Sequence, residues 1–369
     1  MKIAIHTISD DTNFGNRLQN YALKKGLEAD NLNEVLTLQD AENSTYNYYS
    51  FKKDISVSRA YLYLTSLKAI LKRVQLFEVK KYFLHKRREN TFRKFTKLYV
   101  PKTKKINVGE QDFDLFVIGS DQIWNPNFRS NLKKDFLPEI KNKNIISYAA
   151  SIGVENISDR SLSTISKGVK QLSAISVREF SAKKILDPLT DLEIQVHIDP
   201  TMLLSQSEWH EVAKNADKRV KTKDVYVLTY FLGALTEIEK NYINTYAKQK
   251  KARIININDI SEKYFSKIGP IEFLWLFEHA ETIFADSYHA AVFSIIFKKN
   301  FEIFNRHDSF NEMNTRMETL FSHFKIGDRF HNLSSEEKFL DSVEYCEIDQ
   351  ILQKKRDEAK KWLENFIVE

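Results

Sequence analysis

The chain has 369 residues, of which 42% are hydrophobic, and 56 lysines and arginines against 50 acidic residues give a net charge of +6. This hydrophobic content excludes a globally disordered chain, and the length predicts about two domains. The single cysteine, Cys346, excludes an internal disulfide and a cysteine-based zinc site, and it favours a reducing compartment.

The positive charge is concentrated in one segment. Residues 52–105 hold 17 lysines and arginines against three acidic residues, a net charge of +14, so the rest of the chain is at −8. The longest apolar run, residues 290–297, is far shorter than the ~20 residues of a membrane helix, and the N-terminus lacks a signal-peptide core. We therefore expect a cytoplasmic protein, with the basic segment as a candidate for peripheral binding at the inner membrane face.

Strand-like and helix-like stretches alternate in the first half of the chain, where hydrophobic runs predict strands and apolar residues at helical spacing predict helices. In chain order we expect a strand at 3–8, a helix at 17–29, a long basic helix at 58–98, strands at 113–119 and 145–149, a helix at 161–172, a strand at 174–177 and a helix at 181–186.

The alternation restarts after residue 197. We expect strands at 225–232, 252–256, 282–285 and 301–304, and helices at 236–250, 271–278, 289–297, 314–320 and 348–366. Two such runs predict two doubly wound, Rossmann-like α/β domains with mostly parallel sheets and a ligand site in the cleft between them. The predicted boundaries are 1–195, with a basic helical insertion at 52–105; 196–345; and a C-terminal helix, 346–369, that packs back on the first domain.

The strongest local signal is residues 113–125, FDLFVIGSDQIWN, where a hydrophobic strand runs directly into a glycine and polar residues. Gly119 permits a tight turn with close backbone approach. Ser120, Asp121 and Gln122 then lie at the carboxyl end of the strand, where ligands bind in parallel α/β sheets. The same pattern is also typical of a structural strand–turn–helix with a serine or aspartate cap.

A similar arrangement recurs at residues 283–292, IFADSYHAAV. His289 is expected in the first turn of a helix, whose free N–H groups and positive potential suit a phosphate or carboxylate. The alternative is a structural histidine beside an apolar helix.

Three weaker signals complete the set. Arg178, directly after a strand, is able to bind a carboxylate or phosphate through two parallel hydrogen bonds, or to form a surface pair of little energetic value with Glu179. Asn16 and Gln19 lie in a polar glycine loop after the first strand, and residues 314–316 also fit an ordinary N-capped helix. The sequence has no Walker A, GxGxxG, HExxH or GxSxG motif, which disfavours kinase, nicotinamide, zinc-hydrolase and serine-hydrolase functions.

Seven segments, taken together and in this order, resemble the polysaccharide pyruvyl transferase family. They span roughly residues 3–330 and leave the basic segment 52–105 outside. They are 15–23 (GNRLQNYAL), 119–125 (GSDQIWN), 147–151 (SYAAS), 176–179 (SVRE), 199–201 (DPT), 286–290 (DSYHA) and 314–316 (NTR).

The resemblance implies a two-domain fold like that of the GT-B glycosyltransferases. It also implies transfer of a pyruvyl group from phosphoenolpyruvate to a sugar of a bacterial-type surface polysaccharide, or of its lipid-linked precursor, as a ketal. In that family a histidine and basic cluster in the second domain and an arginine in the first bind phosphoenolpyruvate; by motif these are His289 and Arg178. Some members have an arginine where this chain has Ser287, so Arg316 or Arg306 is expected to replace that charge.

This reaction needs cationic groups for the two anionic ends of phosphoenolpyruvate, an acid for its methylene carbon and a base for the sugar hydroxyls. We expect His289 as general acid or phosphate ligand and Asp121 as base, with Glu179 as the alternative. The expected donor-binding residues are Arg178, Ser287, Arg316, Arg306 and Ser120. The expected acceptor-binding residues are Asn16, Gln19, Gln122, Trp124 and Asn125, with Trp124 stacking on a sugar face. Phosphoenolpyruvate is a co-substrate, and no metal or other cofactor is required.

Two other functions remain open at this point. One is a GT-B-type glycosyltransferase that uses a nucleotide sugar. The other is nucleic-acid binding through the basic segment, which is disfavoured because its aromatic residues follow helical spacing and no nucleic-acid module is recognisable. For that segment we expect either a solvated helical face or docking on an anionic membrane or a lipid diphosphate-linked acceptor.

Overall fold

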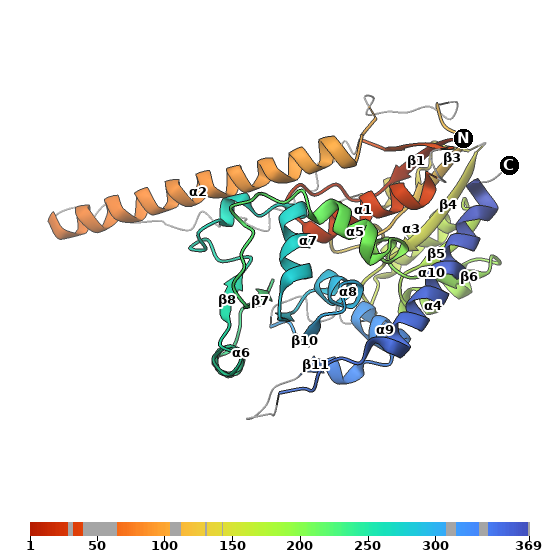
Figure 1. Ribbon diagram of the computed structural model, residues 1–369. Coiled ribbons are helices and arrows are strands. Elements are labelled where there is room, and N and C mark those ends of the chain that lie inside the picture. The colour runs from red at the N-terminus through yellow and green to blue at the C-terminus, as the bar shows by residue number, and fades with distance from the viewer. Residues whose placement is uncertain are drawn as a thin grey trace.

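The computed structural model describes residues 1–28, 32–39, 65–103, 112–129, 131–141, 143–307, 315–331 and 339–367, with side chains from residue 78 onward in the third of these ranges. Residues 52–64 and 104–105 of the basic segment, and Asn314, therefore lie outside the described residues. The chain forms two sheets, and the strands of each sheet alternate in sequence with helices (Figure 1).

The first sheet is fully parallel and has the strand order β2-β1-β3-β4-β5-β6. Its strands are β1 (Lys2–His6), β2 (Glu34–Thr37), β3 (Leu115–Ile118), β4 (Asn144–Ala150), β5 (Ala174–Val177) and β6 (Ile194–Val196). The helices within this half are α1 (Phe14–Leu27), α2 (Thr65–Tyr99), α3 (Asp159–Val169) and α4 (Phe180–Leu186).

The second sheet is also parallel, with the order β11-β10-β9-β7-β8. Its strands are β7 (Tyr226–Tyr230), β8 (Arg253–Asn256), β9 (Thr282–Ala285), β10 (Asn300–Phe304) and β11 (Phe330–His331), and its helices are α6 (Glu237–Gln249), α7 (Pro270–His279), α8 (Tyr288–Ile296) and α9 (Thr315–Phe324). The helix α5 (Gln206–Ala213) lies between the two halves in sequence. The predicted fold class, two doubly wound α/β domains facing each other as in GT-B proteins, is confirmed.

A shared hydrophobic core joins the two halves. Phe14, at the start of α1, packs its ring against Phe92 of α2, Tyr230 of β7 and Phe273 of α7, with ring centroids 4.8, 5.8 and 4.6 Å away. Burial of such aromatic rings is a large apolar contribution to stability. The first turn of α1 is therefore fixed against the second domain, at the edge where the strand ends of both sheets meet.

The last helix, α10 (Tyr345–Ile367), connects the domains a second time. Its first residue donates a hydrogen bond from the Tyr345 hydroxyl to the Lys299 carbonyl, 2.6 Å away, in the second domain. Further along, Trp362 contacts the rings of Tyr148 and His197 in the first half, with centroids 6.2 and 5.2 Å apart. Figure 1 shows the helix running back toward the N-terminus.

Candidate active site at the facing strand ends

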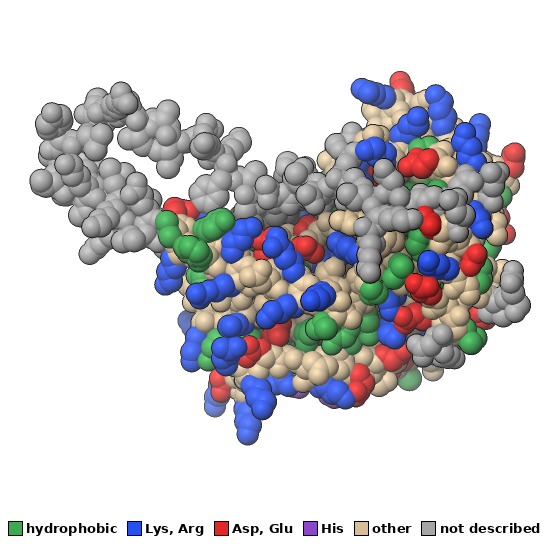
Figure 2. All heavy atoms as spheres, turned by 90° about the horizontal axis from the view of Figure 1, so that it is seen from above, with side chains coloured by type: hydrophobic (Ala, Val, Ile, Leu, Met, Phe, Trp, Pro, Cys, Tyr) green, Lys and Arg blue, Asp and Glu red, His purple; other side chains and the backbone are tan. Residues whose placement is uncertain are grey.

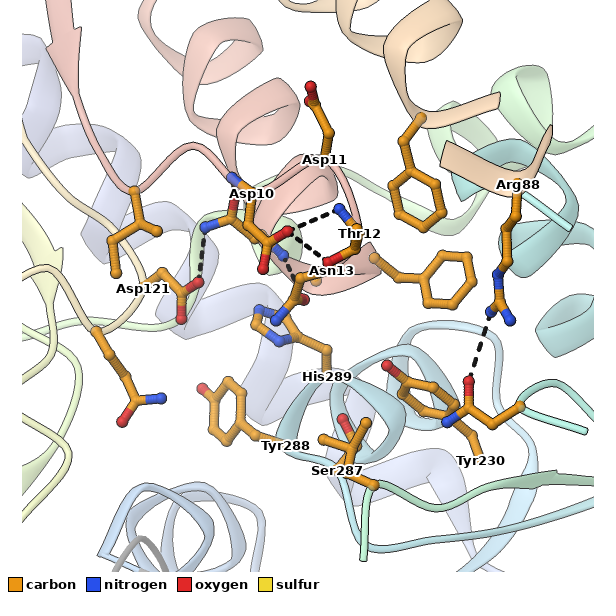
Figure 3. Close-up of a pocket in the computed structure, with 18 of the residues that line it drawn as sticks. Asp10, Asp11, Thr12, Asn13, Arg88, Asp121, Tyr230, Ser287, Tyr288 and His289 are labelled. Atoms are coloured by element: carbon orange, nitrogen blue, oxygen red, sulfur yellow. Dashed lines mark hydrogen bonds between the residues drawn. The ribbon is translucent and has the colours of Figure 1, made fainter. Parts of the chain in front are cut away.

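A pocket of about 460 Å³ lies where the two domains meet. Its walls come from the loop after β1, the turn after β3, the loops after β7 and β9, and one face of α2. Figure 3 shows the residues of the two domains opposite one another, with Asp121 on one side and Ser287, Tyr288 and His289 on the other. Carboxyl ends of parallel strands are the usual ligand sites of such sheets, so this pocket is the candidate active site.

The turn after β3 places Asp121 at the pocket wall. Gly119 has φ of 126°, and a Cβ there would lie 2.3 Å from the Tyr148 carbonyl oxygen, so only glycine fits the turn. Asn16, at the start of α1, donates from Nδ2 to Oδ2 of Asp121 over 2.9 Å. The predicted turn is therefore present, and it orients a carboxylate toward the cleft.

Arg178 lies behind this wall and is only 2% exposed. Its Nη2 lies 2.9 Å from Oδ2 of Asp199, and its Nη1 lies 3.9 Å from Oδ1 of Asp121. It also donates to the Ser120 hydroxyl. The expected donor-binding arginine is thus placed between two carboxylates, and Ser120, fully buried, is one of its partners rather than part of the pocket lining.

These contacts keep both carboxylates ionised. Burial raises the pKa of Asp121, but Arg178, His289, Asn16 and Arg316 together outweigh it, so the pKa lies below its ordinary value. Burial likewise raises the pKa of Asp199, and Arg178 and His289 bring it well below the ordinary range.

The second-domain wall is the N-terminus of α8. Ser287 occupies the N-cap position without a side-chain capping bond among the described residues. The free N–H groups and the helix dipole there favour an anion. His289, in the first turn, is only 7% exposed. Its Nε2 lies 3.6 Å from Oδ2 of Asp199, which is longer than a hydrogen bond, and it makes no hydrogen bond to any described residue. A buried ring nitrogen without a hydrogen bond is rare, and it leaves His289 able to bind a ligand.

Arg316 of α9 adds a cation to the same wall. Its guanidinium lies 5.4 Å from the centroid of the Tyr288 ring, and its Nε is buried without a hydrogen-bond partner in the described residues. Burial, and then the nearby Arg178, lowers the pKa of Arg316. Arg306 also lines the pocket. Ser287, Arg306 and Arg316 therefore line the same pocket as His289; their expected role in donor binding stays a prediction.

Gly15 brings the two walls into contact. A Cβ at this position of α1 would lie 2.0 Å from Nδ1 of His289, well inside any van der Waals separation. The glycine in the 15–23 segment is therefore needed for the histidine of the second domain to approach the first.

The predicted acceptor residues divide into two groups. Asn16 and Gln122 line the pocket. Gln19 bonds within the first domain, donating to Thr7 and accepting from the Ser120 N–H, while Asn125 is fully buried and donates to Oε1 of Gln122. The prediction that Trp124 stacks on a sugar is wrong: it is fully buried and stacks on Phe136, with centroids 5.1 Å apart.

Glu179, the alternative base, is also fully buried, and its side chain stabilises the loop after β4 through hydrogen bonds. Its Oε1 accepts hydrogen bonds from the Ser151 hydroxyl and the N–H groups of Ile152 and Gly153. Burial raises the pKa of Glu179. Of the two residues expected as the base, Asp121 lines the pocket and Glu179 does not.

Several pocket residues were absent from the sequence prediction. The basic segment was placed apart from the site, but one face of α2 lines the pocket through Lys81, Tyr82, His85, Lys86, Arg88, Glu89 and Phe92. The helical spacing of 81, 85, 88 and 92 was a usable signal. Asp10 and Asp11 follow the first predicted strand, and Tyr230 lies at the end of β7. Asp199, which contacts Arg178 and His289 without lining the pocket, belongs to the 199–201 segment but was given no role.

The architecture of two parallel-sheet α/β domains around a common cleft is that of the GT-B class. Within that class, the model of the polysaccharide pyruvyl transferase family matches residues 13–308. The chain belongs to the polysaccharide pyruvyl transferase family.

Solved structures of low sequence identity also resemble the chain. UDP-GlcNAc 2-epimerase from Neisseria meningitidis, bound to UDP-GlcNAc, is 10% identical over 100% of this chain and 93% of its own, with a TM-score of 0.47. The corresponding epimerase from Methanocaldococcus jannaschii is 13% identical over 96% and 99%, with a TM-score of 0.46. Anabaena HepE in complex with UDP and glucose is 9% identical over 100% and 95%, with a TM-score of 0.36. Among curated proteins, none matches the chain significantly.

No helix within the described ranges has both the length and the hydrophobicity to cross a membrane.

Proposed function

We propose that this transferase moves the pyruvyl group of phosphoenolpyruvate onto a sugar of a surface polysaccharide, such as a capsule or exopolysaccharide, or onto its lipid-linked precursor, and forms a pyruvate ketal. Family membership supports pyruvyl transfer. The observation that carries the choice of donor is the second-domain wall, where the N-terminus of α8, the imidazole of His289 and the cation of Arg316 converge. Such a wall suits a ligand with two anionic groups.

In the proposed reaction, the sugar and phosphoenolpyruvate are converted to a pyruvate ketal and inorganic phosphate. The methylene carbon of the enol takes a proton, and two sugar hydroxyl oxygens form bonds to the neighbouring carbon. The bond from that carbon to the phosphate oxygen breaks, and inorganic phosphate leaves. Of the two hydroxyl protons, one replaces the proton given to carbon and the other leaves with phosphate. No metal or nucleotide takes part.

His289 is the proposed acid or phosphate ligand, because it lies at the helix N-terminus and faces the first domain across Gly15. Asp121 is the proposed base, because it is ionised and lines the opposite wall. Its low pKa makes it a weak base in the free enzyme. A bound anion close to Arg316 and His289 would offset their positive potential and raise the proton affinity of Asp121 when the donor is present.

The test is phosphate release from phosphoenolpyruvate by the purified chain. Release is expected only with a galactose-, glucose- or mannose-type acceptor, and the acceptor should gain the mass of a pyruvyl ketal. His289→Ala should lower turnover by at least about 100-fold, the usual contribution of a positioned acid or base. Calorimetry that detects tight UDP or GDP binding but no phosphoenolpyruvate binding would favour the glycosyltransferase instead.

A further inference from the structure

The outer face of α2 is strongly basic. From residue 78 to the end of the helix, its exposed side chains include six cations, at Lys80, Lys86, Arg87, Arg93, Lys94 and Lys97. The two acidic residues of this stretch, Glu78 and Glu89, are half-buried, and Glu89 pairs with Lys86 and Arg93. Within the described side chains of α2, positive charge therefore predominates at the surface.

Large apolar side chains accompany these cations. Val79, Tyr82 and Phe83 are 52%, 58% and 56% exposed, and the last two are in ring contact at 5.7 Å. Val79, Phe83, Lys86, Asn90, Arg93 and Lys97 follow the i, i+4, i+7 spacing that puts residues on one stripe of a helix. Figure 1 shows α2 projecting beyond the second sheet, and Figure 2 shows the same side from above, with blue side chains over it and a green patch beside the grey atoms.

We propose that this face binds the surface of an anionic lipid bilayer. A helix with lysines and arginines around exposed aromatic and aliphatic side chains is suited to the boundary between headgroups and acyl chains, where each basic residue adds electrostatic attraction. A nucleic acid would use the same cations, and a single strand could stack a base on Phe83, but the aliphatic Val79 on the same exposed stripe would gain nothing from it. Because cations and exposed apolar side chains lie on the same stripe of α2, a membrane fits this face better than a nucleic acid does.

Another face of the same helix forms a wall of the active-site pocket, and Tyr82 and Lys86, which line the pocket, lie at the border between the two faces. Arg88 is buried there, donates from Nη1 to the Ile257 carbonyl over 3.0 Å, and stacks on Phe14 and Phe265 at 4.9 and 4.4 Å. Phe92 packs on Phe14 as well. Because α2 is fixed to both domains by these contacts, a membrane on its outer side would lie next to the pocket. An acceptor held in the bilayer by a lipid would then reach the pocket along α2. Membrane binding itself does not depend on the proposed reaction.

The experiment is co-sedimentation of the full chain with vesicles. Vesicles of phosphatidylcholine alone are compared with vesicles containing about one third phosphatidylglycerol, a charge density at which basic segments bind. We expect sedimentation with the anionic vesicles and release at high ionic strength, which screens the attraction. The variant Lys80→Gln/Arg87→Gln/Lys94→Gln/Lys97→Gln should lower the partition coefficient at least about tenfold. Val79→Ser/Phe83→Ser should lower it too, while duplex DNA retention should not change in that variant.

A matched control replaces four exposed lysines on α3 and α10, in Lys167→Gln/Lys170→Gln/Lys360→Gln/Lys361→Gln, and should bind vesicles like the wild type. None of the substituted α2 residues lines the pocket, so thermal melting and phosphate release with a water-soluble acceptor should be unchanged and would show that the variants fold. Equal sedimentation with both vesicle types, or equal binding by the fourfold α2 variant and the wild type, would overturn the proposal. DNA binding without vesicle binding would assign the face to nucleic acid instead.

Discussion

Asp199, which follows the last strand of the first sheet, lies close to His289 of α8, with Oδ2 of the aspartate 3.6 Å from Nε2 of the histidine. The same oxygen lies 2.9 Å from Nη2 of Arg178. Asp199 also caps the short 3₁₀ helix Pro200–Leu203, accepting hydrogen bonds from the Thr201 N–H and hydroxyl. One buried carboxylate therefore holds both the arginine behind the first wall and the histidine of the second.

Replacing this carboxylate by an amide tests its role as a positioning residue. Asp199→Asn keeps the shape but removes the charge that attracts Arg178 and His289. Since small displacements of reacting groups cost about 100-fold in rate, we expect kcat to fall by about that factor, with a smaller change in the KM for phosphoenolpyruvate. Steady-state kinetics together with thermal melting checks this, and a kcat close to that of the wild type would remove Asp199 from the site.

The contact between Gly15 and His289 predicts a severe effect of one added methyl group. In Gly15→Ala the new Cβ would overlap the imidazole, so the histidine must move away from the first domain. We expect turnover to fall by at least about 100-fold. Gly327→Ala is the matched control, because no atom lies within 4 Å of its added Cβ, and its activity and melting should equal those of the wild type. Full activity in Gly15→Ala would contradict the arrangement of the two walls.

Arg178 and Arg316 should respond differently to truncation. Arg178→Ala leaves two buried carboxylates, Asp121 and Asp199, without their cation, and breaking a buried pair in this way costs about 3–5 kcal/mol of the free energy of unfolding. Burial opposes the charge of Arg316, so Arg316→Ala should cost less stability.

Kinetic measurements on Arg178→Ala and Arg316→Ala distinguish an arginine that stabilises the fold from one that binds the substrate. Arg316 lines the pocket, so Arg316→Ala should raise the KM for phosphoenolpyruvate at least about tenfold, the loss expected for one charge-assisted contact. Urea titrations and kinetics of both variants give the comparison. A larger stability loss in Arg316→Ala than in Arg178→Ala would be the opposite of what these contacts imply.

The sequence predicted the two sheets well because their central strands are buried and appear as uninterrupted hydrophobic runs, such as Leu115–Ile118. The strands β2, β6 and β11 were not predicted. They have four, three and two residues, lie at sheet edges and contain exposed or half-buried positions, so they lack a strong hydrophobic pattern.

The site was predictable where topology alone places a residue. Asp121 and His289 each follow a parallel strand, and carboxyl ends of such strands converge. Trp124 and Glu179 were expected to line the pocket because they are close in sequence to Asp121 and Arg178, but the turns after β3 and β5 direct both side chains into the protein interior. The contribution of α2 depends on which distant element its face meets, and local sequence does not contain that information.

Two histidines near α10 predict a loss of stability in mild acid. Burial, and then Lys355, lowers the pKa of His197 to about 4 and that of His323 to about 4, from an ordinary value of 6.5. Both are therefore neutral in the folded protein at neutral pH. As the pH falls below 6.5, these histidines become protonated in the unfolded chain before they do so in the folded protein. Their contribution to stability is therefore complete above pH 6.5 and is lost as the pH falls toward 4.

Urea titrations at several pH values between these limits measure this loss. His323→Gln removes one titrating group, and its free energy of unfolding should therefore fall less steeply over the same interval than that of the wild type. An identical pH dependence in the wild type and His323→Gln would show that the buried imidazole does not resist protonation, and the acid sensitivity would then have to come from the carboxylates.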